Sequence, residues 1–253
     1  MENGTVKKRY AVLDLLRGLT LVSMIFYHGM WDLVYMAGVS APWYQTGAGY
    51  IWQQSICWTF ILLSGFCQPF GKRKLKRALL VSGGGLLVTG VTLIFMPSNR
   101  VVFGVLTLIG FCMLFWAVLE KQLLRIPPFR GLIGSMCLFG VTRNVNSGWL
   151  GFEGLNLQKL PDSLYCNLFT AWLGFPASGF YSTDYFSVFP WIFLYGAGFY
   201  LHLLLKKNGG SAFGPLEKRH LPWIEWLGRN SLLIYLLHQP ILYGTMMVYQ
   251  FIF

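Results

Sequence analysis

The stretch RYAVLDLLRGLTLVSMIFYHGMWDL, from Arg9 to Leu33, indicates how this chain folds. It is long and apolar enough to cross a bilayer, which takes roughly 20 residues. Four ionisable side chains interrupt it: Asp14, Arg17, His28 and Asp32. At about 100° per residue, all four fall within roughly 60° of one helix face. Because such groups cost on the order of 3 kcal/mol each at membrane depth, the stripe predicts a site or a pathway inside a helix bundle.

The composition of the chain predicts a membrane protein. Of its 253 residues, 55% are hydrophobic and 11% are charged, whereas soluble globular proteins carry about 25% charged residues. The basic N-terminus leads from Lys7 and Lys8 into an apolar run that is long and lacks a small-x-small cleavage site. We therefore interpret that run as an uncleaved span rather than a signal peptide. We expect a single multi-pass domain over residues 1–253, in the plasma membrane.

Apolar runs predict an all-α bundle of about seven transmembrane helices. They cover roughly 10–36, 49–70, 78–96, 101–119, 130–142, 185–205 and 226–251. The run at 130–142 is short for a span, and if it does not cross, every later assignment inverts. Between the fifth and sixth runs, residues 164–173 are apolar but too few to span, so we expect a re-entrant or interfacial segment there. We also expect Asp184 to cap the run that begins at 185.

The basic residues predict an orientation with the N-terminus in the cytoplasm. The connections at 72–77, 120–130 and 206–220 then lie inside, in agreement with the positive-inside rule. Only four of the twenty Lys and Arg residues do not lie inside: Arg17, Arg100, Arg143 and Lys159. Because the charge clusters at span ends, the net charge of +11 is assigned to topology, and no nucleic-acid partner is expected.

The first stripe carries residue types suited to acid–base chemistry. His28 and Asp32 are spaced i and i+4, so an imidazole can meet a carboxylate and act as a general base or an acyl-accepting nucleophile. Arg17 lies roughly 16 Å nearer the cytoplasmic end, where it can hold a phosphate or carboxylate, with Asp14 to orient it. The structural alternative is an Asp14–Arg17 salt bridge that docks the span, with His28 bonded to a neighbouring helix.

A second polar stripe lies in GRNSLLIYLLHQPIL, from Gly228 to Leu242. Ser231, Tyr235 and His238 share one helix face, Gln239 lies beside them, and Pro240 is expected to kink the helix. His238 lies about 18 Å from the cytoplasmic end of its span, so we expect it to meet His28 at one level. Contacts that merely hold the helices together are the alternative. The five cysteines have no metal or disulfide spacing, and no metal site is expected.

These stretches resemble a known family. The first span is similar to the Arg-ten residues-His signature of membrane acyltransferases. Its wording, LDLLRG followed by YHGMWDL, resembles the bacterial relatives of the heparan-α-glucosaminide N-acetyltransferase catalytic domain. Four further stretches agree in order: FILLSGF (Phe60–Phe66), FGVLTLIG (Phe103–Gly110), FPWIFLYGAG (Phe189–Gly198) and SLLIYLLHQP (Ser231–Pro240). Thr107 departs from the pattern, because relatives often carry His at that position.

The resemblance implies a membrane helix bundle that moves an acetyl group from cytosolic acetyl-CoA to an amine or hydroxyl across the membrane. The acceptor would be an amino sugar or another glycan. The resemblance places His28 and Arg17 in the active site, with Asp14 and Asp32 supporting them. Arg17 and the second stripe, Ser231, Tyr235, His238 and Gln239, would line the donor cavity. Acetyl-CoA is then a substrate, no tightly bound cofactor is expected, and a homodimer is compatible with this picture.

Two other classes of protein fit the same residues. A solute transporter or flippase also places polar side chains at mid-depth beside a proline-kinked helix. No inverted repeat is visible in the sequence, which argues mildly against this class. A non-catalytic membrane protein that binds acyl-CoA or lipid is the third hypothesis.

Overall fold

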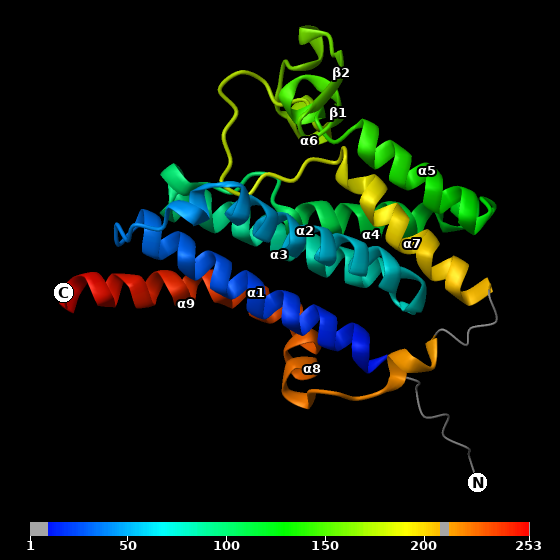
Figure 1. Cartoon of the computed structure of the whole chain (residues 1–253), viewed down its shortest axis with the longest axis horizontal. Coiled ribbons are helices and arrows are strands. Elements are labelled where there is room, and N and C mark those ends of the chain that lie inside the picture. Colours follow the sequence, from blue (N-terminus) through cyan, green and yellow to red (C-terminus); the bar gives the residue numbers. More distant parts are fainter. Residues whose placement is uncertain (1–9, 208–212, 253) are drawn as a thin grey trace. The chain divides into compact units, whose positions relative to one another are not determined.

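A computed structural model describes residues 10–207 and 213–252 of the chain (Figure 1). The predicted basic N-terminus (Lys7, Lys8 and Arg9) and residues 208–212 of the predicted connection at 206–220 lie outside the described residues. The described chain is mostly helical, as predicted. It divides into two compact units, one with residues 1–60 and 205–253 and the other with residues 61–204. Each unit is described by itself below.

Four of the described helices are long and apolar enough to cross a membrane. They are α1 (Ala11–Tyr35), α3 (Lys74–Phe95), α4 (Val105–Leu123) and α9 (Ser231–Ile252). The other predicted runs are also helical, in α2 (Gly47–Cys67), α5 (Pro128–Val141) and α7 (Trp191–Lys207). Length and composition therefore establish a helical membrane protein with four candidate spans among the described residues.

The first unit is built around α1. α9 and the short helix α8 (Pro222–Arg229) both pack against α1 (Figure 1). The buried side chains of Leu21, Met24 and Ile56 form a core that Tyr235 of α9 also contacts.

The prediction of one continuous span over 226–251 is wrong, because the backbone N–H of Asn230 bonds to the carbonyls of Trp226 and Leu227 and ends α8 there. α9 then begins at Ser231 and continues as a helix through Pro240; the kink stays a prediction.

Glycines let α8 approach the backbone of α1. A Cβ atom on Gly18 would lie 2.1 Å from the carbonyl oxygen of Ile224, and one on Gly228 would lie 1.9 Å from the carbonyl oxygen of Asp14. No side chain fits at either position. Close backbone contact of this kind is typical of helices that meet through small residues.

The second unit packs α3 tightly along α4. A Cβ atom on Gly85 would lie 2.6 Å from the Thr107 nitrogen, and one on Gly110 would lie 2.7 Å from the Ser82 nitrogen. A buried polar link crosses the same unit, where Gln68 donates from Nε2 to the Met113 carbonyl at 3.1 Å and accepts from the Tyr195 hydroxyl at 3.0 Å. The buried amide of Gln68 is thus paired at both its nitrogen and its oxygen, as burial requires.

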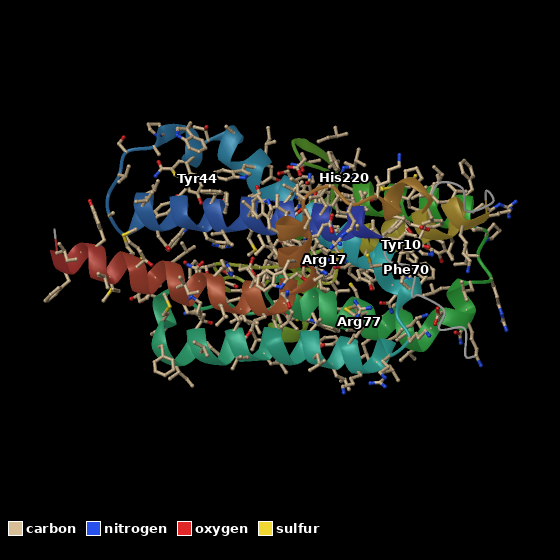
Figure 2. All side chains as sticks on the ribbon, turned by 90° about the horizontal axis from the view of Figure 1, so that it is seen from below. Tyr10, Arg17, Tyr44, Phe70, Arg77 and His220 are labelled. Atoms are coloured by element: carbon tan, nitrogen blue, oxygen red, sulfur yellow. The ribbon has the colours of Figure 1, made fainter. Side chains whose placement is uncertain are left out.

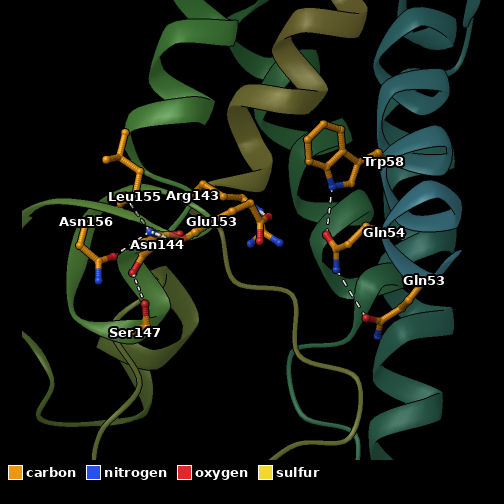
Figure 3. A network of polar contacts seen from close by, with 9 residues as sticks. All are labelled: Gln53, Gln54, Trp58, Arg143, Asn144, Ser147, Glu153, Leu155 and Asn156. Carbon is orange, nitrogen blue, oxygen red and sulfur yellow. Dashed lines mark hydrogen bonds and ion pairs between the residues drawn. The ribbon is translucent and has the colours of Figure 1, made fainter. Parts of the chain in front are cut away.

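The stretch between α5 and α7 holds a β-hairpin that the sequence analysis did not predict. β1 (Trp149–Phe152) pairs antiparallel with β2 (Leu155–Lys159), with a register shift between Leu150 and Gly151. Figure 3 shows Asn144 closing the hairpin, since its amide donates to the Glu153 carbonyl at 2.7 Å and to Asn156 Oδ1 at 3.0 Å. Arg143 pairs with Glu153 at 2.9 Å (Figure 3).

The apolar run expected to be re-entrant or interfacial forms the short helix α6 (Leu168–Leu173). Asn167 and Thr170 begin α6 with a reciprocal capping box. The expected cap from Asp184 is corrected by the structure. Its carboxylate accepts the backbone N–H of Val105 at 3.2 Å, so Asp184 caps α4 rather than the helix that follows it in sequence. α7 begins only at Trp191.

Candidate functional site

The N-terminal part of α1 carries the predicted ion pair. Arg17 Nη1 donates to Asp14 Oδ1 at 3.1 Å and approaches the Gly228 carbonyl at 3.5 Å. The pair also contacts α8. This contact agrees with the structural alternative, in which the Asp14–Arg17 salt bridge docks α1 against a neighbouring helix. Figure 2 shows Arg17 beside α8 and Tyr44 towards the opposite end of α1.

A cavity of about 310 Å³ opens beside this ion pair. Ionisable side chains dominate its lining, which consists of Ala11, Asp14, Glu217, Arg219, Glu225 and Arg229. Glu225 is buried and accepts the His220 backbone N–H at 3.0 Å and Arg219 Nε at 3.3 Å. These two donors, the backbone N–H first, hold the pKa of Glu225 below its usual value. Glu225 is therefore charged at neutral pH, and the cavity mixes carboxylates with guanidinium groups.

This cavity was not predicted from the sequence. Arg219 and Arg229 were assigned to membrane topology, and no role was predicted for Glu225. One feature of the sequence could have indicated the cavity. Glu225 is one of only nine acidic residues in the chain, and it follows a basic run at 218–220. A carboxylate close to several basic side chains can pair with more than one of them and form an ion-pair network.

Further along α1, two histidines from different helices meet. The rings of His28 on α1 and His238 on α9 have centroids 5.0 Å apart. The expectation that these side chains meet is confirmed. His238 is buried, and its Nδ1 lies 2.5 Å from the Tyr235 carbonyl oxygen. Because a carbonyl only accepts, the neutral ring carries its proton on Nδ1 and keeps a lone pair on Nε2. Within the described residues Nε2 has no hydrogen-bond partner.

Asp32 lies one helical turn beyond His28 but does not bond to it. Its side chain is 1% exposed, and neither carboxylate oxygen has a hydrogen-bond partner among the described residues. The predicted His28–Asp32 contact is therefore wrong as a hydrogen bond. The ring of His28 packs instead against Tyr27, at 5.9 Å between centroids, and against His238.

The remaining predicted residues of α9 divide into two groups. Gln239 follows His238, and its buried Oε1 has no hydrogen-bond partner in the part of the chain that the structure describes. The ring of Tyr235 lies 5.3 Å from that of His238. Ser231 is the first residue of α9, which places it about 10 Å from His238 along the helix axis. The structure thus groups Tyr235 and Gln239 with His238, the residue that meets His28, and leaves Ser231 apart from them.

Thr107, the departure from the family pattern, has a packing role in the second unit. Its hydroxyl donates to the Gly104 carbonyl at 2.6 Å, and its backbone lies against Gly85 of α3. The second unit also has a basic cavity of about 410 Å³, lined by residues 71–76 with Ala117 and Glu120. Lys74 and Glu120 form an ion pair there. The predicted basic connection at 72–77 is therefore part of a cavity wall.

Fold and site together define an α-helical membrane protein whose first helix carries buried polar groups and a histidine paired with a second histidine. Over residues 9–240 the chain matches the family model described as heparan-alpha-glucosaminide N-acetyltransferase, catalytic, and it belongs to that family. The match includes every residue of both stripes, from Asp14 to Gln239, and makes the chain a membrane acyltransferase by family. No curated protein and no solved structure matches the chain.

Proposed function

We propose that the chain is a transmembrane acetyltransferase that takes the acetyl group from cytosolic acetyl-CoA. The acceptor is an amino sugar or another glycan on the outer side of a bacterial plasma membrane. The observation that carries this proposal is the pair of histidines, His28 and His238, held 5.0 Å apart between two apolar helices. Imidazole is the side chain best suited to proton transfer near neutral pH, and a membrane interior does not supply it without cost.

The proposed topology has seven crossings and a cytoplasmic N-terminus. The direction of the helices in the first unit supports it. α1 and α9 run parallel, because Asp14 and Gly18 lie against Gly228, His28 against His238, and Met36 accepts a bond from Gln250. First and last spans run in the same direction when the number of crossings is odd. A topology in which the short helix α5 does not cross would make these two spans antiparallel.

The donor is proposed to enter beside Arg17. Together with Arg219 and Arg229 of the neighbouring cavity, this side chain offers guanidinium groups that suit the phosphates of CoA. From Arg17 to His28 the helix rises about 16 Å, a length that the extended pantetheine arm can cover. The basic connections would attract the anionic donor to this side of the membrane.

The acetyl group then moves in a substitution at the thioester carbonyl. The acceptor nitrogen or oxygen forms a bond to the carbonyl carbon, the carbon–sulfur bond breaks, and CoA leaves as the thiol after taking a proton. An imidazole removes a proton from the acceptor, a form of catalysis that supplies roughly 10²–10⁴-fold. Holding both substrates at the histidine pair contributes further. Transfer by way of an acetyl group on His28 is the two-step variant of the same chemistry.

The test is to incubate the purified chain with radiolabelled acetyl-CoA and a panel of glucosamine acceptors. We expect labelled acceptor with the wild-type chain and none with His28→Ala, which should still fold and bind CoA. Full activity of that variant would contradict the role of His28. Ligand flux in vesicles without chemistry would support a transporter, and binding without transfer would support a non-catalytic protein. A label trapped on His28 would establish the two-step route.

A further inference from the structure

The basic cavity between the start of α3 and the later turns of α4 carries a charge that its own wall does not balance. Four of the described residues that line it are cationic, namely Lys72, Arg73, Lys74 and Lys76. Glu120 is the acidic residue of this lining, and it is already paired with Lys74. Four cations and one carboxylate leave an excess of positive charge, which suits an anionic group.

The dimensions and side chains of the cavity suit a phosphate ester. Its volume is about 410 Å³, within the range of roughly 300–1,000 Å³ that small-molecule sites occupy. The Lys74 side chain is 19% exposed and is held towards α4 by Glu120, whereas Lys72 and Arg73 are exposed. Ammonium and guanidinium groups bind phosphate oxygens through charge-assisted hydrogen bonds. The lining can therefore surround a phosphate group from more than one side.

An exposed apolar stripe on α3 begins at the same cavity. Leu75 lines the cavity, and at about 100° per residue Leu79 and Leu86 lie within roughly 40° of it on the helix surface. These three side chains, called the leucine stripe below, are 52%, 62% and 66% exposed. From Leu75 to Leu86 the helix rises about 16 Å, close to half of the roughly 30 Å hydrocarbon core of a bilayer. The stripe is therefore about as long as one leaflet is thick.

The connection between the two surfaces favours a lipid over a free phosphate. Exposed leucines are expected on any helix that faces a bilayer, and a free phosphate would use the cations alone. Leu75 belongs to both surfaces, so a ligand with an anionic head and an apolar chain contacts both of them from within the membrane. Basic clusters at the cytoplasmic end of a membrane helix are typical of anionic lipid binding. The proposed topology would place residues 72–77 on that side.

We propose that this cavity binds the phosphate group of an anionic phospholipid, with one acyl chain of the lipid along the leucine stripe. Lys74, together with Lys72 and Arg73, holds the phosphate. The bound lipid contacts the start of α3 and Ala117 of α4, so it stabilises the packing of these two helices. Lipid binding here is independent of acetyl transfer, and the experiments that test it use no acetyl donor.

The first part of the test follows thermal unfolding of the full chain in a neutral detergent. The added ligands are dioleoyl phosphatidylglycerol, dioleoyl phosphatidylcholine, inorganic phosphate and CoA. We expect phosphatidylglycerol to raise Tm by several degrees and phosphatidylcholine to have little effect, because the zwitterionic headgroup carries no net charge. An equal shift with both lipids would overturn the proposal.

Charge variants locate the headgroup. Lys72→Gln combined with Arg73→Gln should weaken phosphatidylglycerol binding about tenfold or more, because each basic residue near the headgroup adds to the attraction. The matched control is Lys121→Gln combined with Arg125→Gln, which removes the same two charges from exposed residues outside the lining. Equal losses in the two double variants would show general attraction to a negative surface and overturn the site. A Tm shift with inorganic phosphate or CoA that only the first double variant removes would assign the cavity to a free phosphate ester and also overturn it.

The second part locates the acyl chain on the unmodified protein, so it does not depend on how a variant folds. Phosphatidylglycerol with a diazirine in one acyl chain is bound and irradiated, and the labelled peptides are identified. We expect label within residues 75–86 of α3, displaced by phosphatidylglycerol and not by phosphatidylcholine. Leu233 and Leu237 of α9, which are 58% and 47% exposed, provide the comparison. Label spread equally over α3 and α9, or displaced equally by both lipids, would contradict a lipid site at this cavity.

Discussion

At the scale of single residues, the two histidines of the site differ in how far their chemistry is fixed. The Tyr235 carbonyl accepts the Nδ1 proton of His238, so Nε2 of the neutral ring is an acceptor whichever substrate is present. His28 has ring contacts with Tyr27 and His238 that leave its tautomer open. The fixed lone pair on Nε2 suits His238 to accept a proton. His28 can adopt either tautomer, which suits a residue that also carries an acyl intermediate.

We expect His238→Ala to lower acetyl transfer by roughly 10²–10⁴-fold, the usual contribution of a general base. Binding of acetyl-CoA should persist, and added imidazole should restore part of the rate, which a purely structural role of His238 would not allow. The measurement is transfer of labelled acetyl with and without imidazole. His220→Ala is the control, because that side chain is exposed and only its backbone N–H is used, by Glu225. Wild-type rates in His238→Ala would contradict the assignment.

At the scale of elements, α8 is held to α1 by backbone contact rather than by large side chains. Gly18 and Gly228 leave no space for a Cβ atom, and the Arg17–Asp14 pair reaches α8 at the Gly228 carbonyl. The contact between α1 and α8 therefore leaves little room for adjustment, and the stability that it provides depends on how closely the two backbones fit. Shape-dependent contacts respond sharply to the addition of a single methyl group.

We expect Gly228→Ala to destabilise the chain clearly, because its Cβ would lie 1.9 Å from the Asp14 carbonyl oxygen. Overpacking of this kind typically costs about 1–3 kcal/mol, and backbone atoms cannot give way as a side chain does. Thermal unfolding in detergent measures the effect. Gly244→Ala in α9 is the matched control, since nothing lies within 4 Å of its Cβ position. Equal Tm values for the two variants would show that the crossing of α1 and α8 is looser than described.

At the scale of the whole molecule, the distribution of basic residues and the parallel direction of α1 and α9 are independent arguments for the same topology. The first is a property of the loops, and the second a property of packing within one unit. The proposed topology would place the hairpin and α6 on the outer side of the membrane. It would also place Cys166, which precedes α6 and is exposed, on that side.

Cys166 therefore tests the orientation in intact cells. We expect a membrane-impermeant maleimide to label it, because the thiol is exposed in a loop that the proposed topology places outside. Cys166→Ser should lose the label, with Cys137 in the apolar helix α5 remaining unlabelled. Labelling only after the cells are opened would mean that α5 does not cross or that the orientation is reversed.

Most of the helices could be predicted from the sequence because a bilayer imposes a minimum length of apolar residues. The meeting of His28 and His238 could be predicted as well, since the rise per residue converts sequence position into depth. The break at Asn230, the hairpin and the cavity at Glu225 could not. The cavity depends on contacts between segments far apart in the sequence, such as Gly18 with Gly228. The break and the hairpin are held by local bonds, such as those of Asn230 and Asn144, which a search for apolar runs does not detect. Asp32 was assigned to His28 on spacing alone, which does not fix where a side chain points.

The break between α8 and α9 has a consequence for how the histidines are aligned. Gly18 meets Gly228, and His28 meets His238. The two intervals are equal, since 28 − 18 and 238 − 228 are both ten residues. Gly18 to His28 is uninterrupted helix, whereas Gly228 to His238 includes the break at Asn230. The break therefore sets the direction in which α9 leaves the glycine contact and brings His238 to His28. An insertion of one residue on one path alone would turn its histidine by about 100°. The same insertion on both paths would keep the two histidines level with each other.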